Sequence, residues 1–126
     1  MARKIVVADN NLDNLYRLAG FFDKQGHHVT ISGEADNLLT MTLEENFDLA
    51  VVSFEMCLSD GEPVVAQLKN ELLETPLIVS AAMHSLEKER YIRSLGVEYY
   101  LVQPINFSEL KIIAEQCYKI HDQKHA

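Results

Sequence analysis

Residues 49–53, Leu-Ala-Val-Val-Ser, form a short apolar run that ends in one small polar side chain. A short apolar run with β-branched residues indicates a strand that is buried on both faces. The loop after Ser53 closes with the turn dipeptide Asp60–Gly61, and residues 62–73 then show helical spacing of their apolar side chains. Open α/β sheets place functional sites where a strand delivers a polar side chain beside a loop, so Ser53 is the first candidate.

The same unit of apolar run, turn and amphipathic segment recurs along the chain. The runs that we expect to be strands are residues 5–8, 28–31, 49–53, 77–79 and a segment within 97–102. The segments that we expect to be helices are residues 12–25, 34–44, 62–73, 85–95 and 107–120. Five such units with right-handed crossovers give a parallel sheet with helices on both faces.

Helical spacing also predicts which side chains face the core. The inward residues expected in the first two helices are Leu12, Leu15, Tyr16, Leu18, Ala19, Phe22, Leu38, Leu39 and Leu43. We expect one domain over residues 1–126, with a loose tail at 121–126.

Composition excludes several classes of function. The chain has 126 residues, 48% of them hydrophobic and 24% charged, with a formal net charge of -8. An acidic globular chain is a poor binder of nucleic acid or membrane surfaces. Cys57 and Cys117 form no CxxC pair, which favours reduced thiols in a cytoplasmic protein. We see neither a signal peptide nor a run long enough to span a membrane.

Four blocks of sequence, in this order, resemble the receiver domain of bacterial response regulators. They are residues 4–11, 48–61, 75–79 and 100–104, so the resemblance covers essentially the whole chain. The resemblance implies a flavodoxin-like, doubly wound, five-stranded parallel sheet of order 2-1-3-4-5 with five helices. It also implies a place in two-component signalling.

Receiver domains move a phosphoryl group from a partner histidine to their own aspartate, and the resemblance assigns each position of that machinery. Two acidic positions after the first strand hold magnesium in the family, and here they are Asp9 and Asn10. The acceptor position is Ser53, and the lysine position before Pro104 is Gln103. The hydroxyl position is assigned to Ala81, or to Ser80 if the alignment shifts by one residue; the aromatic switch position is Tyr100.

These departures remove the family's chemistry one role at a time. Magnesium prefers anionic oxygen ligands, and Asp9 is the one carboxylate ligand expected. Ser53 cannot form an acyl phosphate, and Gln103 cannot pair with a phosphoryl charge as lysine does. We therefore interpret the pocket as natively degenerate and expect no catalytic residue, metal or cofactor. Glu55 is a candidate for a negative charge near the pocket, although the family tolerates glutamate there without that role.

The leading hypothesis is a stand-alone pseudo-receiver, not an enzyme, that acts by phosphorylation-independent protein–protein interaction. Two alternatives stay open: an atypical receiver that still accepts phosphate at an unorthodox acceptor such as Ser53, and a small-ligand sensor that uses the emptied pocket. We expect a protein partner from a bacterial signalling pathway, or a homodimer, on the face formed by the fourth helix, the fifth strand and the fifth helix. The candidate residues of this face are Tyr91, Arg93, Tyr100 and Lys111.

Overall fold

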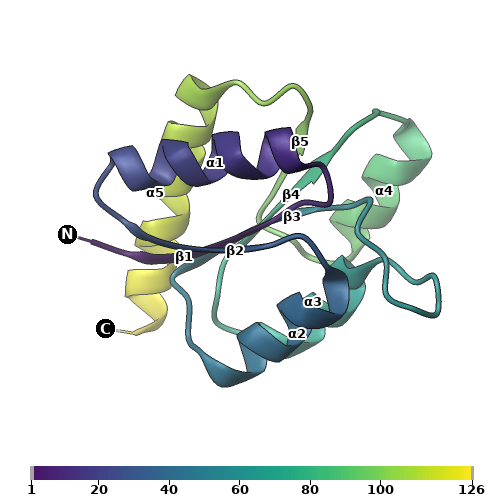
Figure 1. The fold of residues 1–126 in the computed structure, drawn as a ribbon, viewed down its shortest axis with the longest axis horizontal. Coiled ribbons are helices and arrows are strands. Elements are labelled where there is room, and N and C mark those ends of the chain that lie inside the picture. Colours follow the sequence, from purple (N-terminus) through teal and green to yellow (C-terminus); the bar gives the residue numbers. More distant parts are fainter. Residues whose placement is uncertain (1, 126) are drawn as a thin grey trace.

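Five short parallel strands form the middle layer of the molecule, and helices cover both faces (Figure 1). The structure, a computed structural model, describes residues 2–125. The strands are β1 (Lys4–Ala8), β2 (His28–Ser32), β3 (Leu49–Ser53), β4 (Leu77–Ala81) and β5 (Tyr99–Val102). Their order is β2-β1-β3-β4-β5, with parallel pairing throughout. This confirms the predicted doubly wound sheet.

The helices alternate with the strands along the chain, as the sequence predicts. They are α1 (Leu12–Lys24), α2 (Ala35–Glu44), α3 (Val64–Glu71), α4 (Leu86–Ser94) and α5 (Phe107–Lys124). Helices α1 and α5 cover one face of the sheet, and α2, α3 and α4 cover the other. Both faces of the central strands are therefore buried, which explains why β3 has no polar residue before Ser53.

Alternating side chains of the strands feed two separate cores. Residues at odd positions of β1 and β3, such as Val7 and Val51, pack against α1 and α5. Their neighbours, such as Val6 and Val52, pack against α2, α3 and α4. This alternation decides which side chains meet where the strands end.

Polar side chains cap the starts of three helices. Asn11, Ser85 and Asn106 each accept a backbone N–H of the first turn, at 3.1, 3.1 and 3.0 Å. Such caps satisfy backbone donors that would otherwise lack partners. Gly26 follows the end of α1 with a φ of 85°, a conformation that favours glycine.

Three side chains that were predicted to face the core are exposed instead. Leu12, Tyr16 and Leu43 have exposed fractions of 59%, 60% and 68%. Each lies at the edge of its helix's apolar stripe, beyond the arc that the sheet covers. The prediction from helical spacing alone therefore assigned more side chains to the core than the fold buries.

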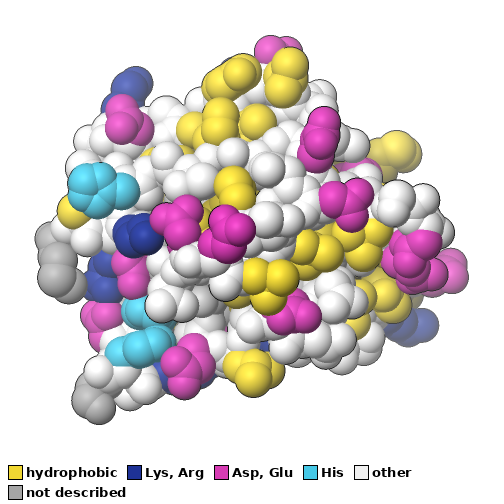
Figure 2. Space-filling view, turned by 60° about the horizontal axis from the view of Figure 1, so that its bottom comes forward, with side chains coloured by type: hydrophobic (Ala, Val, Ile, Leu, Met, Phe, Trp, Pro, Cys, Tyr) yellow, Lys and Arg dark blue, Asp and Glu magenta, His cyan; other side chains and the backbone are white. Residues whose placement is uncertain are grey.

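The expected loose tail is wrong for residues 121–124, because α5 continues through Lys124. Two contacts hold its last turns. Arg3 makes a bidentate ion pair with Asp122 at 2.6 and 3.0 Å, and His121 Nε2 lies 2.8 Å from Asp48 Oδ1. Figure 2 shows histidine, acidic and basic side chains gathered at this end of the molecule. Residue 126 lies outside the described residues.

Over residues 2–125, α5 and the shorter helices all fall short of the length and apolarity that a bilayer-spanning helix requires.

Candidate functional site

The carboxyl ends of β1, β3, β4 and β5 converge at one edge of the sheet. The side chains delivered there are Asp9, Ser53, Ser80 and Gln103. Asp9, Ser53 and Ser80 have exposed fractions of 1%, 2% and 1%, so this is a buried polar cluster at the end of an apolar sheet. Of the predicted pocket residues, the structure brings Asp9, Ser53 and Gln103 together.

Ser80 supplies the hydroxyl of this cluster, one residue before Ala81, to which the resemblance assigns the family's hydroxyl position. Ser80 lies opposite Ser53 in the register of β3 and β4, and its Oγ lies 3.3 Å from Gln103 Nε2. Ala81 is one residue further, on the face that packs against α2, α3 and α4, because side chains alternate along a strand. The sequence analysis kept Ser80 as its alternative; the register shows that Ser80 joins the cluster, and the alignment of the family position stays a prediction.

Gln103 connects the cluster through both ends of its amide. Its oxygen accepts a hydrogen bond of 2.8 Å from Asn14 Nδ2 on α1. Its nitrogen donates to Ser80 Oγ at 3.3 Å and to Asp9 Oδ2 at 3.4 Å. Gln103 therefore satisfies three neighbours without adding a charge. Asn14 was not predicted, because its role depends on how α1 is placed over β5.

Asp9 is the buried carboxyl of the cluster. Asn11 donates its N–H to Asp9 Oδ1 at 2.9 Å. Burial raises the pKa of Asp9, and the hydrogen bond from Asn11 opposes this effect without cancelling it. Asn10, the next residue, is exposed and carries a neutral side chain.

The donor set does not fit magnesium. A hard cation of this kind requires several anionic or carbonyl oxygens that are free to coordinate it. Both carboxylate oxygens of Asp9 already accept hydrogen bonds from the protein, and Ser53 and Asn10 are neutral. Residues 2–125 contain no group of three His, Cys, Asp or Glu side chains arranged to hold a metal ion.

Glu55 reaches from the loop after β3 to the loop after β4. Its Oε1 accepts the Ala82 N–H at 2.7 Å and lies 3.4 Å from Ser53 Oγ. Its Oε2 lies 3.3 Å from Lys88 Nζ in the first turn of α4. The sequence analysis gave Glu55 little weight. The helix dipole disfavours a lysine in the first turn of a helix, so Lys88 could have indicated an anionic partner nearby.

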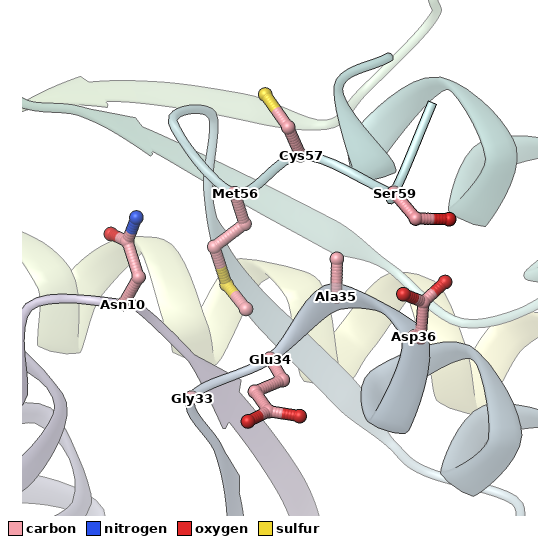
Figure 3. Close-up of a pocket in the computed structure, with 8 residues that line it drawn as sticks. All are labelled: Asn10, Gly33, Glu34, Ala35, Asp36, Met56, Cys57 and Ser59. Carbon is pink, nitrogen blue, oxygen red and sulfur yellow. The ribbon is translucent and has the colours of Figure 1, made fainter. Parts of the chain in front are cut away.

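A shallow hollow of about 290 Å³ lies beside the cluster (Figure 3). Asn10 borders it on one side, Glu34 and Asp36 at the start of α2 on another, and Met56 and Cys57 on a third. Ser53 and Gln103 do not border the hollow. The hollow therefore lies outside the buried cluster that contains Ser53.

The predicted interaction face contains contacts between aromatic and charged side chains. The Tyr100 ring lies 6.2 Å from the His84 ring and 5.9 Å from the guanidinium of Arg93. Tyr91 is 39% exposed and packs edge-on against Phe54 at 5.9 Å. Lys111 is exposed on α5. Phe54 precedes Glu55, so the face and the buried cluster meet through one loop.

Comparisons with known proteins agree with this architecture. No family model matches the chain. The receiver domain of Francisella response regulator 1452 superposes with a TM-score of 0.82 at 26% identity, covering 93% of this chain and 97% of that one. A CheY-like receiver domain protein from Methanospirillum hungatei superposes with a TM-score of 0.84 at 19% identity, covering 98% and 99%.

The curated relatives are similar to this chain over only part of their own length. The transcriptional regulatory protein ZraR of Escherichia coli is 23% identical over 112 residues, which is 89% of this chain and 25% of ZraR. The sensory/regulatory protein RpfC of Xanthomonas campestris is 26% identical over 111 residues, which is 85% of this chain and 15% of RpfC. The chain thus spans a quarter or less of these relatives.

The chain has the fold of the response-regulator receiver domains with which it superposes. Sequence order, sheet order and the converging strand ends agree on this point. The assignment of Ser53 and Gln103 to the family's acceptor and lysine positions stays a prediction.

Proposed function

We propose that this receiver domain is a pseudo-receiver that signals by phosphorylation-independent protein–protein interaction. The observation that carries the proposal is the closed network around Gln103, whose amide bonds Asn14, Ser80 and Asp9. A pocket that binds a phosphoryl group needs a cation at this position that is free to pair with the negative charge of the phosphate. The Gln103 amide is neutral and already bonds three protein groups, so it cannot supply that positive charge.

The acceptor position supports the same proposal. Ser53 is 2% exposed, and its hydroxyl bonds to the adjacent Glu55. A serine hydroxyl is a weak nucleophile unless a base activates it. The Glu55 carboxylate is also committed to Ala82 and Lys88, and its negative charge repels an incoming phosphoryl donor.

The partner would bind the face that carries Tyr91, Arg93, Tyr100 and Lys111. Aromatic and arginine side chains are the usual energetic anchors of protein interfaces. This partner is either a protein of a bacterial signalling pathway or a second copy of the chain. The free thiols of Cys57 and Cys117 fit a reducing compartment such as the bacterial cytoplasm.

The direct test is a titration of the purified protein with acetyl phosphate or beryllofluoride in the presence of millimolar magnesium. We expect no covalent phosphate by intact-mass measurement, no shift of the backbone NMR spectrum, and no heat of magnesium binding by calorimetry. A receiver domain with the acidic residues and the lysine of the family is the positive control. Stoichiometric phosphorylation of any side chain, Ser53 included, would overturn the proposal.

A further inference from the structure

Three donors from different parts of the chain converge on the Glu55 carboxylate. The Ala82 N–H from the loop after β4 lies at 2.7 Å, the Lys88 ammonium at 3.3 Å and the Ser53 hydroxyl at 3.4 Å. Two oxygens of one carboxylate thus receive a backbone N–H, a cation and a hydroxyl. This is the set of groups that binds a small carboxylate or a phosphate.

We propose that Ser53, Ala82 and Lys88 form an anion-binding site and that Glu55 is its permanent, intramolecular ligand. The occupied site ties the loop after β3 to the loop after β4 and to the first turn of α4. The biological meaning of this site rests on the proposed function. In a receiver domain that is not phosphorylated, the Glu55 carboxylate supplies a fixed negative charge in place of a phosphate.

The placement of Lys88 supports this assignment independently. Lys88 is the third residue after the capping Ser85, in the first turn of α4, where the helix dipole disfavours a positive charge. Its ammonium folds back, away from α4, to Glu55 and to the Met83 carbonyl oxygen at 3.0 Å. The side chains of Lys88 and Glu55 are only 23% and 31% exposed, so solvent screens this pair less than a fully exposed one.

The site is mechanically linked to the predicted interaction face. Lys88 Nζ lies 5.6 Å from the centre of the Phe54 ring, and the same ring packs against Tyr91 of α4. Loss of the Glu55 anion would remove the partner that holds Lys88, and with it a contact that places α4. The position of Tyr91 thereby depends on whether the anion site is filled.

Amide hydrogen exchange at Ala82 tests the site without any partner or phosphoryl donor. In Glu55→Ala we expect the Ala82 N–H to exchange about tenfold faster or more, because a charge-assisted hydrogen bond is lost. Sodium acetate should reverse this change saturably, whereas sodium chloride at equal ionic strength should not. Glu55→Gln keeps a carbonyl acceptor in place, so we expect a smaller increase and no response to acetate.

Two further variants make the result decisive. Glu62→Ala removes an exposed carboxylate from the same loop and should leave Ala82 exchange unchanged. Lys88→Met should speed Ala82 exchange only severalfold, since the Glu55 acceptor stays, and it serves as the test if Glu55→Ala does not fold.

Unchanged Ala82 exchange in Glu55→Ala, or equal effects of acetate and chloride, would overturn the anion site and leave the interaction module standing. Phosphorylation of the unmodified protein would instead overturn the proposed function. The two failures are therefore distinguishable.

Discussion

Asn14 donates a hydrogen bond of 2.8 Å to the side-chain oxygen of Gln103, across 89 positions of sequence. This bond turns the amide nitrogen of Gln103 toward Ser80 and Asp9. Gln103 is thereby built into the fold as a structural link between α1, β4, Asp9 after β1 and the loop after β5.

We expect Gln103→Ala to lower the free energy of unfolding by about 1–3 kcal/mol, because it leaves buried polar groups of Asp9 and Ser80 without a partner. Urea denaturation measures this change. The matched control is Gln116→Ala, at an exposed position of α5, which should change the stability by less than about 0.5 kcal/mol. Equal effects of the two substitutions would show that the Gln103 bonds contribute little.

Asp9 should make stability depend on pH in a specific direction. Burial raises its pKa above the ordinary value of 3.8, so the folded state binds the proton more tightly than the unfolded state. The contribution of Asp9 to stability is therefore full below pH 3.8 and is lost as the pH rises through the raised value. We expect the unfolding free energy of Asp9→Asn, minus that of the unmodified protein, to increase from about pH 4 to pH 7 in denaturant titrations. A constant or falling difference contradicts this.

The fold was predictable because its signal is periodic and local. The β-branched runs that became β1 and β3 are short and are followed by turn residues, and the helices expected from residues 12 and 107 begin at Leu12 and Phe107. The end of α5 was not predictable in the same way. Arg3 and Asp122, which are 119 positions apart, hold it, and no local pattern reports a contact of that range.

The site was predictable by position but not by contact. Strand order alone places Asp9, Ser53 and Gln103 at one edge of the sheet. The choice between Ser80 and Ala81 required the register of β3 against β4, which a shift of one residue reverses. The role of Glu55 required the distance from its carboxylate to Lys88 and Ala82 on another loop.

Restoring the acceptor alone should not restore phosphotransfer. Groups that act together in catalysis are strongly non-additive, so Ser53→Asp without a metal-binding carboxylate or a lysine lacks most of the machinery. It also places a further buried carboxylate close to Glu55, which adds repulsion.

The informative comparison is Ser53→Asp against the triple variant Asn10→Asp, Ser53→Asp, Gln103→Lys. Ala81 is kept in both variants, so the comparison isolates the effect of Asn10 and Gln103. With acetyl phosphate and magnesium, we expect the single variant to be phosphorylated at least about tenfold more slowly than the triple variant, measured by intact mass. A single variant that equals the triple variant would mean that Asn10 and Gln103 do not limit the chemistry.

The surface of α4 and β5, rather than the buried cluster, should determine partner binding. A two-state surface shifts only when a ligand binds one state better than the other, and without phosphate that ligand is the partner. Arg93 and Tyr100 touch each other on this surface, and Tyr91 is partly exposed beside them. Their truncation removes contact area without emptying the main cores.

We expect Tyr91→Ala, Tyr100→Ala and Arg93→Ala each to weaken partner binding or self-association by about 1–2 kcal/mol, measured by calorimetry or sedimentation. Far-UV circular dichroism should stay unchanged. Tyr16→Ala is the matched control, because Tyr16 is 60% exposed on α1, which covers the opposite face of the sheet. Ser53→Ala should leave binding and cellular function nearly unaltered, since it removes one 3.4 Å hydrogen bond to Glu55 and keeps the contacts of Glu55 with Ala82 and Lys88. If Ser53→Ala abolished function while the α4 and β5 variants bound normally, the buried cluster would be the working part of the protein and the interaction proposal would fail.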